Sequence, residues 1–379
     1  MKIAIVSNFP IHVIPEFGEA YRPAGHYATW LPQLARAFSA FTDLEIHWVT
    51  LFKELPSPRR VSWCGQTFHV LPAGRGGLRA PTLYYQDQTR IHACLREIGP
   101  ELVHGWGTED VYALAAVNSG FPNLVSMQGI LSEYVLKAGG GARHYLQALL
   151  ELFALIRADA LTVESAWGKD LLLKRNPSAK IEVIEYGVDD HFLERPWKPD
   201  PAQPSALFVG SIVAAKGIQD LIAAYADPAL AGYELWIAGS GPEEWVVPLR
   251  QSSSPNVRWL GRLPSTEIAE LMSRAWCLAL PTRVDTSPNV VKEARVIGLP
   301  VITTRCGGQA TYVDDRENGF LVEPEAISHL REALATVLGN LDRCRAMGAH
   351  RHKEHRELLH PHLTARKFAE VYRSSQARG

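Results

Sequence analysis

The sequence predicts an α/β fold with two domains, each built on a parallel β-sheet, and three observations support this prediction. Short apolar and β-branched runs alternate with longer stretches of helical spacing, which is typical of parallel strands joined by crossover helices. The chain has 379 residues, more than the roughly 250–300 at which one hydrophobic core stops growing. The alternation is interrupted once, by a proline-rich segment, and then begins again.

The first half of the chain contains the strands of an amino-terminal domain, which we expect over residues 1–190. Between the strands lie stretches with apolar residues at helical spacing, such as Leu31, Leu34 and Phe38. The predicted strands are Lys2–Val6, Ile46–Thr50, Phe68–Leu71, Leu102–His104, Leu124–Met127, Ala160–Val163 and Ile181–Ile184.

A proline-rich segment separates the two halves of the chain. Residues 195–204 contain four prolines, which cannot belong to a helix interior or to a central strand. We therefore expect a linker over residues 191–204.

The second half repeats the alternation, and we expect a carboxy-terminal domain over residues 205–360. Its predicted strands are Ala206–Val209, Glu234–Ala238, Val257–Leu260, Trp276–Leu280, Val301–Thr303 and Gly319–Val322. The tail, residues 361–379, begins with apolar residues at helical spacing, among them Phe368 and Tyr372. We expect this last helix to pack back onto the amino-terminal domain.

Composition excludes several classes of protein. Hydrophobic residues make up 46% of the chain and charged residues 21%, as in ordinary globular proteins. The sequence contains neither an apolar run long enough for a membrane span nor the apolar region of a secretory signal, so we expect a cytoplasmic protein. The net charge of −1 gives no global attraction to nucleic acid. The cysteines form no Cys-x-x-Cys pair, and we predict no metal site.

The segment 280–302 carries the most informative chemistry, because ligands of open parallel sheets lie beyond the carboxyl ends of strands. Ser287 is a good N-cap for a helix, so the N–H groups of Asn289 and Val290 would meet a bound anion. The carboxylates of Asp285 and Glu293 could accept hydrogen bonds from hydroxyls at two ends of one ligand. By spacing alone, they could equally be surface charges in water.

The whole segment resembles the signature of the family 4 retaining glycosyltransferases. That signature is a proline-ended strand, an acid, seven residues, a glutamate and then Ala-x-x-x-Gly-x-Pro-Val, which here runs from Asp285 through Glu293 to Val301. The resemblance implies a GT-B fold, in which two Rossmann-like domains have parallel sheets that face each other across a cleft. It also implies that Asp285 lies against the donor sugar and Glu293 binds the nucleotide ribose. The family usually has glutamate at the position of Asp285.

A second match lies at the start of the carboxy-terminal domain. The family pattern Gly-Arg-x-x-x-x-Lys-Gly, whose arginine and lysine hold the donor diphosphate, stands here as Gly210, Ser211, four residues, Lys216 and Gly217. Lys216 therefore takes the phosphate role by resemblance. Ser211 replaces the arginine, and Arg283 is a candidate for the missing charge.

Further positions follow from the same resemblance. Gly241 occupies a glycine turn of the donor domain, and the backbone near Arg262 and Leu263 lines the base pocket in the family. The remaining expected residues lie in the amino-terminal domain: Gly25, whose backbone would approach the diphosphate, and the substrate-binding candidates His26, His104 and Gln128. Many relatives have a histidine at the position of Gln128, which can bind a sugar hydroxyl but cannot transfer a proton.

The predicted function is metal-independent transfer of a sugar, with retention, from a nucleoside-diphosphate sugar to an acceptor hydroxyl. The catalytic candidates are Lys216, Asp285 and Glu293. No separate cofactor is expected, the donor nucleotide is UDP or GDP, and the acceptor is a carbohydrate, a lipid-linked molecule or a small molecule. A basic loop within residues 130–143 suggests a peripheral membrane contact. The alternatives are a nucleotide-sugar epimerase or hydrolase of the same architecture, or an inactive nucleotide-sugar-binding regulator.

Overall fold

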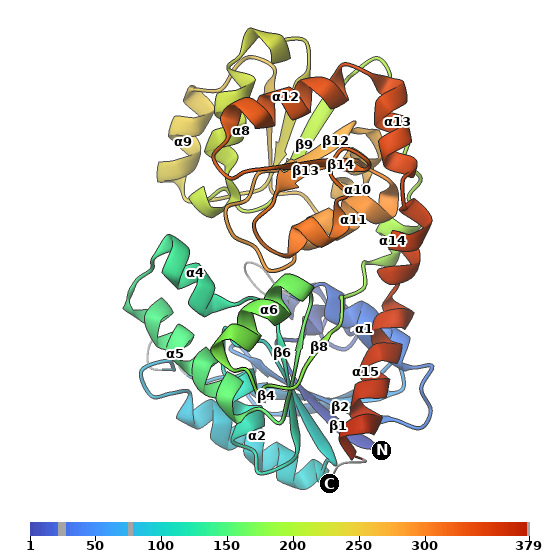
Figure 1. Cartoon of the computed structure of the whole chain (residues 1–379). Helices are drawn as coiled ribbons and strands as arrows, with labels where there is room; N and C mark the ends of the chain where they lie inside the picture. The colour runs from blue at the N-terminus through green and yellow to red at the C-terminus, as the bar shows by residue number, and fades with distance from the viewer. Residues whose placement is uncertain (22–27, 75–78, 377–379) are drawn as a thin grey trace. The chain divides into compact units, whose positions relative to one another are not determined.

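The computed structural model describes residues 1–21, 28–74 and 79–376 and divides the chain into two compact units (Figure 1). The first unit contains Met1–Gly187 and Pro361–Gly379, and the second contains Val188–His360. Each unit is built on its own twisted β-sheet, so the α/β class predicted from the alternation is confirmed.

The first unit contains, in its described part, an eight-stranded sheet of order β3-β4-β2-β1-β5-β6-β7-β8. Its strands are β1 (Lys2–Val6), β2 (Glu45–Phe52), β3 (Arg59–Trp63), β4 (Gln66–Pro72), β5 (Leu102–Trp106), β6 (Asn123–Met127), β7 (Ala160–Val163) and β8 (Ile181–Val183). All neighbours pair in parallel except β3, which is antiparallel to β4. The sequence prediction missed β3. Strands β3 and β4 form a hairpin, closed by a two-residue turn at Cys64 and Gly65. Both residues have positive φ, and the glycine of this turn is the sequence feature that could have indicated the hairpin.

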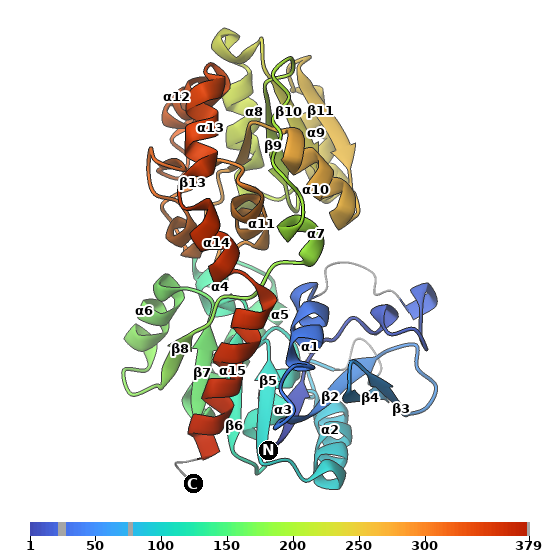
Figure 2. The ribbon, with the colours of Figure 1, turned by 90° about the vertical axis from the view of Figure 1, so that its right-hand side faces the viewer.

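Helices cover both faces of this sheet. They are α1 (Trp30–Phe38), α2 (Tyr85–Ile98), α3 (Tyr112–Val117), α4 (Leu131–Ala138), α5 (Ala142–Arg157), α6 (Ala166–Arg175) and α15 (Pro361–Gln376). Alternate residues of β1 point to opposite faces, since Ile3 and Ile5 pack in the core with α1 and α15, whereas Ala4 packs with α2. Helix α15 lies along α1 in this unit and buries Phe368 and Tyr372 (Figure 2).

The second unit contains a six-stranded sheet of order β11-β10-β9-β12-β13-β14 within the described residues, with every neighbour parallel. Its strands are β9 (Ser205–Val209), β10 (Glu234–Ala238), β11 (Val257–Gly261), β12 (Cys277–Leu280), β13 (Val301–Thr304) and β14 (Gly319–Val322). Its helices are α7 (Asp190–Leu193), α8 (Ile218–Tyr225), α9 (Glu243–Gln251), α10 (Ser265–Arg274), α11 (Asn289–Ile297), α12 (Ile327–Leu338), α13 (Leu341–Ala349) and α14 (His352–Leu358). One hydrophobic core holds these elements together.

The segment 191–204 differs from the linker that its prolines predicted, because it lies inside the second unit and is bound to it. The backbone N–H of Lys198 donates to the Ser273 carbonyl over 2.8 Å, and the indole Nε1 of Trp197 donates to the Ala275 carbonyl over 2.9 Å. These hydrogen bonds hold the segment against the second unit, although its prolines leave it few backbone N–H donors. Prolines therefore mark an irregular but anchored stretch here.

The chain passes between the units at two other places. It leaves the first unit between Gly187 and Val188 and returns between His360 and Pro361. Within the first unit, a Cβ atom on Gly187 would lie 2.6 Å from the Cα of Pro361. Only glycine lets these two stretches of backbone approach so closely.

In the part of the chain that the structure describes, no helix combines the length and the apolar character that crossing a membrane requires.

Candidate active site

Two loops meet at the carboxyl-terminal edge of the second unit's sheet. One follows β9 and ends in a short 3₁₀ turn at Ala214–Lys216, and the other follows β12, the neighbour of β9. Because the strands are parallel, both loops lie at the same edge, where ligands of such sheets bind. There the ammonium of Lys216 forms an ion pair with the Oδ2 atom of Asp285. Asp285 is buried, with 7% of its surface exposed, and Lys216 is half-buried.

Backbone contacts fix these loops to each other. Ala215 accepts hydrogen bonds at its carbonyl from the Thr282 hydroxyl over 3.0 Å and from the Arg283 N–H over 2.8 Å. Gly217 has φ +67°, and a Cβ atom there would lie 1.9 Å from the carbonyl oxygen of Pro281. Glycine is therefore required directly after Lys216, both for its backbone conformation and for space.

Helix α11 begins just beyond Asp285. It starts at Asn289 with Pro288 as its N-cap, so the observed cap lies one residue after Ser287, which the sequence predicted as the N-cap. Ser287 is instead buried, its N–H donates to the Oδ1 atom of Asp285 over 3.3 Å, and its hydroxyl lies 3.4 Å from that of Tyr312. The first turn, with Asn289 and Val290, presents the positive end of the helix dipole at the edge that carries Lys216.

Glu293 lies one turn further along α11 and is half-buried. Burial raises the pKa of its carboxyl group to about 7, while the charges of Lys292 and His191 lower it and that of Asp189 raises it. His191 comes from α7, which packs on α11, and its Nδ1 atom lies 2.6 Å from the Oδ1 atom of Asp189. Burial lowers the pKa of His191, but the hydrogen bond with Asp189 and the charges of Asp189 and Glu293 raise it overall.

The structure gives Arg283 other partners than a phosphate. Its guanidinium donates to both carboxylate oxygens of Asp220, over 3.0 and 3.1 Å, and pairs with Glu325 over 2.7 Å. Arg283, which the sequence analysis considered as a replacement for the arginine that is missing at Ser211, is therefore held by two acids in this structure. Ser211 itself is exposed at the end of β9.

The glycines of the donor-domain turns have a packing role in this structure. A Cβ atom on Gly239 would lie 1.9 Å from the carbonyl oxygen of Gly210, and one on Gly241 would lie 2.1 Å from that of Ile212. The loop after β10 therefore packs directly on the loop after β9. Arg262 is exposed and Leu263 half-buried, both just after β11 at the same edge.

His104 is not available to a substrate, which corrects its prediction as a binding residue. Strand β5 continues to Trp106, so His104 lies inside the strand and is fully buried. Its Nδ1 atom lies 2.8 Å from the hydroxyl of Tyr372 on α15, and its Nε2 atom lies 2.7 Å from that of Ser126. Burial lowers the pKa of this imidazole to about 3, so it is a neutral core residue that joins β5, β6 and α15.

The edge of the first unit's sheet carries a carboxylate that the sequence analysis did not select. Glu109 follows β5 and is exposed, and its Oε1 atom accepts a hydrogen bond from the Gly129 N–H over 3.0 Å. Gln128, just after β6, lies beside it: a Cβ atom on Gly107 would be 2.9 Å from Glu109 Oε2 and 3.4 Å from Gln128 Oε1. The position of Glu109, three residues after a strand end, was the signal that could have identified it.

A buried carboxylate supports this edge. Glu151 of α5, with 1% of its surface exposed, accepts hydrogen bonds from the Thr108 hydroxyl over 3.0 Å and the Leu131 N–H over 2.7 Å. It also accepts from the N–H and the hydroxyl of Ser132, over 3.0 and 2.5 Å. Glu151 therefore caps the amino terminus of α4 from another helix and fixes the loop that carries Glu109.

Two predicted residues, Gly25 and His26, lie outside the described residues. Among the described residues, no group of three or more His, Cys, Asp or Glu side chains could hold a metal ion. Two histidines near the carboxyl terminus pack within the second unit: His355 is buried, and His352 Nε2 lies 2.8 Å from the Val296 carbonyl oxygen.

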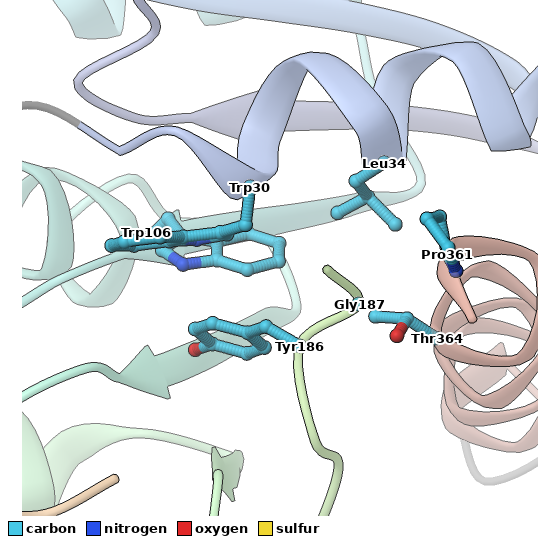
Figure 3. Close-up of a pocket in the computed structure, with 7 residues that line it drawn as sticks. All are labelled: Trp30, Leu34, Trp106, Tyr186, Gly187, Pro361 and Thr364. Carbon is cyan, nitrogen blue, oxygen red and sulfur yellow. The ribbon is translucent and has the colours of Figure 1, made fainter. Parts of the chain in front are cut away.

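The first unit contains an apolar recess whose lining includes none of the candidate residues (Figure 3). The indole of Trp30 stacks on the ring of Tyr186, with ring centroids 5.5 Å apart, and Trp106 lies 5.1 Å from the same ring. Leu34, Gly187, Pro361 and Thr364 complete the lining. Because this recess consists of packed aromatic side chains, we assign it to the core that joins α1 and α15 to the sheet.

Comparisons with known families match both units. A family model described as "Glycosyltransferase Family 4" matches residues 28–192, and one described as "Glycosyl transferases group 1" matches residues 203–340. The chain belongs to the family 4 glycosyltransferases. This family consists of enzymes of carbohydrate biosynthesis that transfer a sugar from a donor, and its fold is GT-B.

The individual proteins that this chain resembles share at most about a third of their aligned residues with it. The chain is 32% identical over 172 residues to the glycogen synthase of Mycobacterium tuberculosis (strain CDC 1551 / Oshkosh), an alignment of 42% of this chain and 40% of that relative. The fold is similar to that of the sucrose-phosphate synthase from Thermosynechococcus elongatus, with a TM-score of 0.81, 20% identity and 100% of both chains covered. It is also similar to Anabaena HepE in complex with UDP-glucose, with a TM-score of 0.71, 17% identity and coverage of 99% of this chain and 100% of that one.

Proposed function

We propose that this family 4 glycosyltransferase transfers a sugar from a nucleoside-diphosphate sugar to an acceptor hydroxyl, with retention of configuration and without a metal ion. The observation that carries the proposal is the ion pair of Lys216 with Asp285 beside the amino terminus of α11. This ion pair places an ammonium that could bind a phosphate beside a carboxylate that could bind a sugar, at one edge of the sheet.

The diphosphate would be bound by positive groups of the second unit. Lys216 supplies an ammonium, and the first N–H groups of α11, at Asn289 and Val290, supply donors on the positive end of a helix dipole. The loop of Gly210 and Ser211 supplies backbone beside them. Since the arginine of the family pattern is absent, Lys216 carries the main positive charge in this proposal.

The two carboxylates would bind the sugar and the nucleoside of the donor. Asp285, already oriented by Lys216 and by the N–H of Ser287, would accept hydrogen bonds from the donor sugar. Glu293 would accept from the ribose hydroxyls. The base would then lie toward Gly241, Arg262 and Leu263, which follow β10 and β11. UDP and GDP are the proposed nucleotides, and the UDP-glucose complex of Anabaena HepE supports the former.

The acceptor would bind at the strand edge of the first unit. Glu109 and Gln128 offer acceptor oxygens beside each other there, and Gln128 offers an amide donor as well. Such groups suit the hydroxyls of a carbohydrate, a lipid-linked sugar or a small polyol. Glu109 adds a carboxylate to the residues expected from the family pattern. The parts proposed for Gly25 and His26 stay predictions.

The chemistry needs charge stabilisation more than a covalent nucleophile. The bond between the anomeric carbon and the phosphate oxygen breaks, and the acceptor oxygen bonds to that carbon on the same face. The acceptor proton passes to the leaving phosphate oxygen. Lys216 and the α11 N–H groups would stabilise the negative charge of that leaving group, a role in which preorganised donors contribute strongly.

The experiment is a binding and product assay on the full chain. UDP, GDP and their sugars are screened by thermal shift, since a ligand that binds the folded state raises the melting temperature. Proton NMR then follows a bound donor with and without acceptors, and the coupling constant of the product's anomeric proton reports retention or inversion. An inverted product would refute the retaining mechanism.

The same assay separates the alternatives. An epimerase or hydrolase would convert the donor when no acceptor is present, and a regulator would bind the donor without turnover. Addition of EDTA should leave the transfer rate unchanged, whereas loss of activity that Mg²⁺ restores would contradict the metal-independent proposal.

A further inference from the structure

Helix α5 of the first unit carries a row of apolar side chains that face solvent. Tyr145, Leu149, Phe153 and Ile156 are exposed by 52, 64, 42 and 72%. Their spacing of four, four and three residues places them on one face of the helix, in what we term the α5 stripe. At 1.5 Å per residue the stripe extends for roughly 16 Å.

The stripe is held outward by the opposite face of the same helix. Gln147, Glu151, Ala154 and Leu155 are buried against the unit, and the Gln147 amide donates to the Glu109 carbonyl over 2.6 Å. The helix therefore has little freedom to rotate its apolar row inward. Figure 1 shows α5 beside α4, with which it packs, and α4 adds Leu136, which is 77% exposed.

The exposed charges on these two helices have one sign. Within the described residues of α4 and α5, the exposed ionisable side chains are all basic: Lys137, Arg143, His144 and Arg157. The two acids of these helices are withdrawn, since Glu151 is buried and Glu133 pairs with Lys137 and Arg175.

These basic groups lie at both ends of the stripe. Arg143 and His144 precede Tyr145, and Arg157 follows Ile156 directly. Arg157 also lies over the ring of Phe153, with its Cζ atom 5.3 Å from the ring centroid. A row of exposed apolar residues flanked by cations is the pattern of a helix that lies in a membrane interface.

We propose that the α5 stripe docks this protein onto the surface of a bilayer that contains anionic lipids. The apolar row enters the boundary between headgroups and acyl chains, while the arginines at its two ends bind lipid phosphates. The α5 stripe belongs to the first unit and the candidate donor residues belong to the second, and the proposal does not rest on the proposed function.

A second copy of the chain could cover the stripe instead of a membrane, but the charges of α4 and α5 disfavour such a dimer. Whether two α5 helices packed in the parallel or the antiparallel sense, basic ends would meet basic ends. No exposed acid on α4 or α5 among the described residues would neutralise them. Anionic phosphates provide the complementary charge that helices α4 and α5 of another copy lack.

The test is vesicle flotation of the full chain without nucleotide or acceptor. We expect binding to phosphatidylcholine vesicles with about one-third phosphatidylglycerol and little binding to phosphatidylcholine alone. About 0.5 M NaCl should weaken the binding, because it screens the phosphate contacts. Failure to float with the anionic vesicles would overturn the proposal.

Paired variants assign the binding to the stripe. Leu149→Ser with Phe153→Ser should lower vesicle affinity at least about tenfold, since two apolar side chains no longer leave water. Val247→Ser on α9 is the matched control, because Val247 is also exposed, at 48%, but lies in the second unit. Equal loss in both variants would refute the assignment.

Charge variants test the lipid specificity. The double variant Arg143→Glu, Arg157→Glu should lose the preference for anionic vesicles. Each lost positive charge should lower the affinity for these vesicles about fivefold. Light scattering of the free protein at rising concentration tests the rival. A dimer that disappears in the Leu149→Ser, Phe153→Ser variant would identify a second copy as the occupant and overturn the membrane proposal, whereas a monomer throughout supports it.

Discussion

The carboxyl-terminal edges of the two sheets present opposite chemistry. In the second unit, the ion pair of Lys216 with Asp285 lies beside the amino terminus of α11, where the positive end of the helix dipole is exposed to a ligand. In the first unit, the carboxylates of Glu109 and Glu151 are bound by backbone N–H groups and hydroxyls. The first arrangement suits an anionic ligand, and the second suits a neutral ligand rich in hydroxyls. In the proposed function, the same topology therefore divides donor and acceptor recognition between two sheet edges.

The largest expected effect comes from the positive side of this comparison. Lys216→Ala should lower kcat/KM for sugar transfer by about 10²–10³, because the leaving diphosphate loses its main charge partner. Steady-state kinetics with the donor identified by the binding screen measure the loss. Circular dichroism should show an unchanged fold.

Lys198→Ala is the matched control, since Lys198 is an exposed lysine of the same unit that belongs to neither loop. It should retain full activity. Normal turnover in the Lys216→Ala variant would refute the phosphate role of that lysine.

The next largest effect is expected at Glu151, which supports the sheet edge of the first unit. Glu151→Gln should destabilise the protein by about 1–3 kcal/mol, because an amide group cannot accept all the hydrogen bonds that the buried carboxylate receives. Urea denaturation of the full chain measures the change. Glu97→Gln, an exposed glutamate of α2, should change stability by less than about 0.5 kcal/mol. Equal stability of both variants would contradict the capping role of Glu151.

A smaller and more selective effect is expected at Glu109. Glu109→Gln should raise KM for the acceptor about tenfold, because a charged hydrogen-bond acceptor is replaced by a neutral one. The affinity for the donor should not change. Initial rates at varied acceptor and varied donor concentrations separate the two. If KM rises for the donor instead, the acceptor assignment of this edge is wrong.

The smallest effect is a pH dependence at Glu293. As the pH falls from about 8 to about 6, its carboxyl group, with a pKa of about 7, takes up a proton and loses capacity to accept ribose hydroxyls. Nucleotide affinity should therefore fall about fivefold to tenfold over this range. Isothermal titration calorimetry at each pH measures it.

Two variants isolate the group responsible. Glu293→Gln should bind weakly at every pH and show a flat profile. His191→Gln should keep the pH dependence while shifting its midpoint upward, because the charge of His191 stabilises the Glu293 carboxylate. A pH profile of Glu293→Gln that matches the wild type would refute the ribose role.

The strands were the most predictable part of the fold. Every predicted strand is present, because buried parallel strands need continuous apolar runs that stand out between polar helices. Strand β3 was missed since Arg59–Trp63 lies at a sheet edge and alternates exposed and half-buried residues. The prolines of 195–204 were misjudged because hydrogen bonds to α10 and the residue after it, which no local pattern reveals, anchor that segment.

The candidate site was predicted unevenly. Lys216 and Asp285 were selected separately, by motifs in different segments, and the structure brings their side chains together. His104 was selected as a histidine at a family-like strand end, because Gln128 stands where many relatives have a histidine, yet β5 continues to Trp106 and keeps His104 inside the strand. Glu109 was overlooked, since its neighbours Gly129 and Gln128 come from the next strand.

The sequence by itself determined the family, the two α/β halves and the donor-site motifs, because these depend on patterns within short segments. Only the tertiary structure decided that Arg283 belongs to Asp220 and Glu325, that His104 is a core residue and that the α5 stripe faces outward. The physical reason is the same in each case. Whether a charge is neutralised, an imidazole is desolvated or an apolar row is covered depends on neighbours that lie far away along the chain.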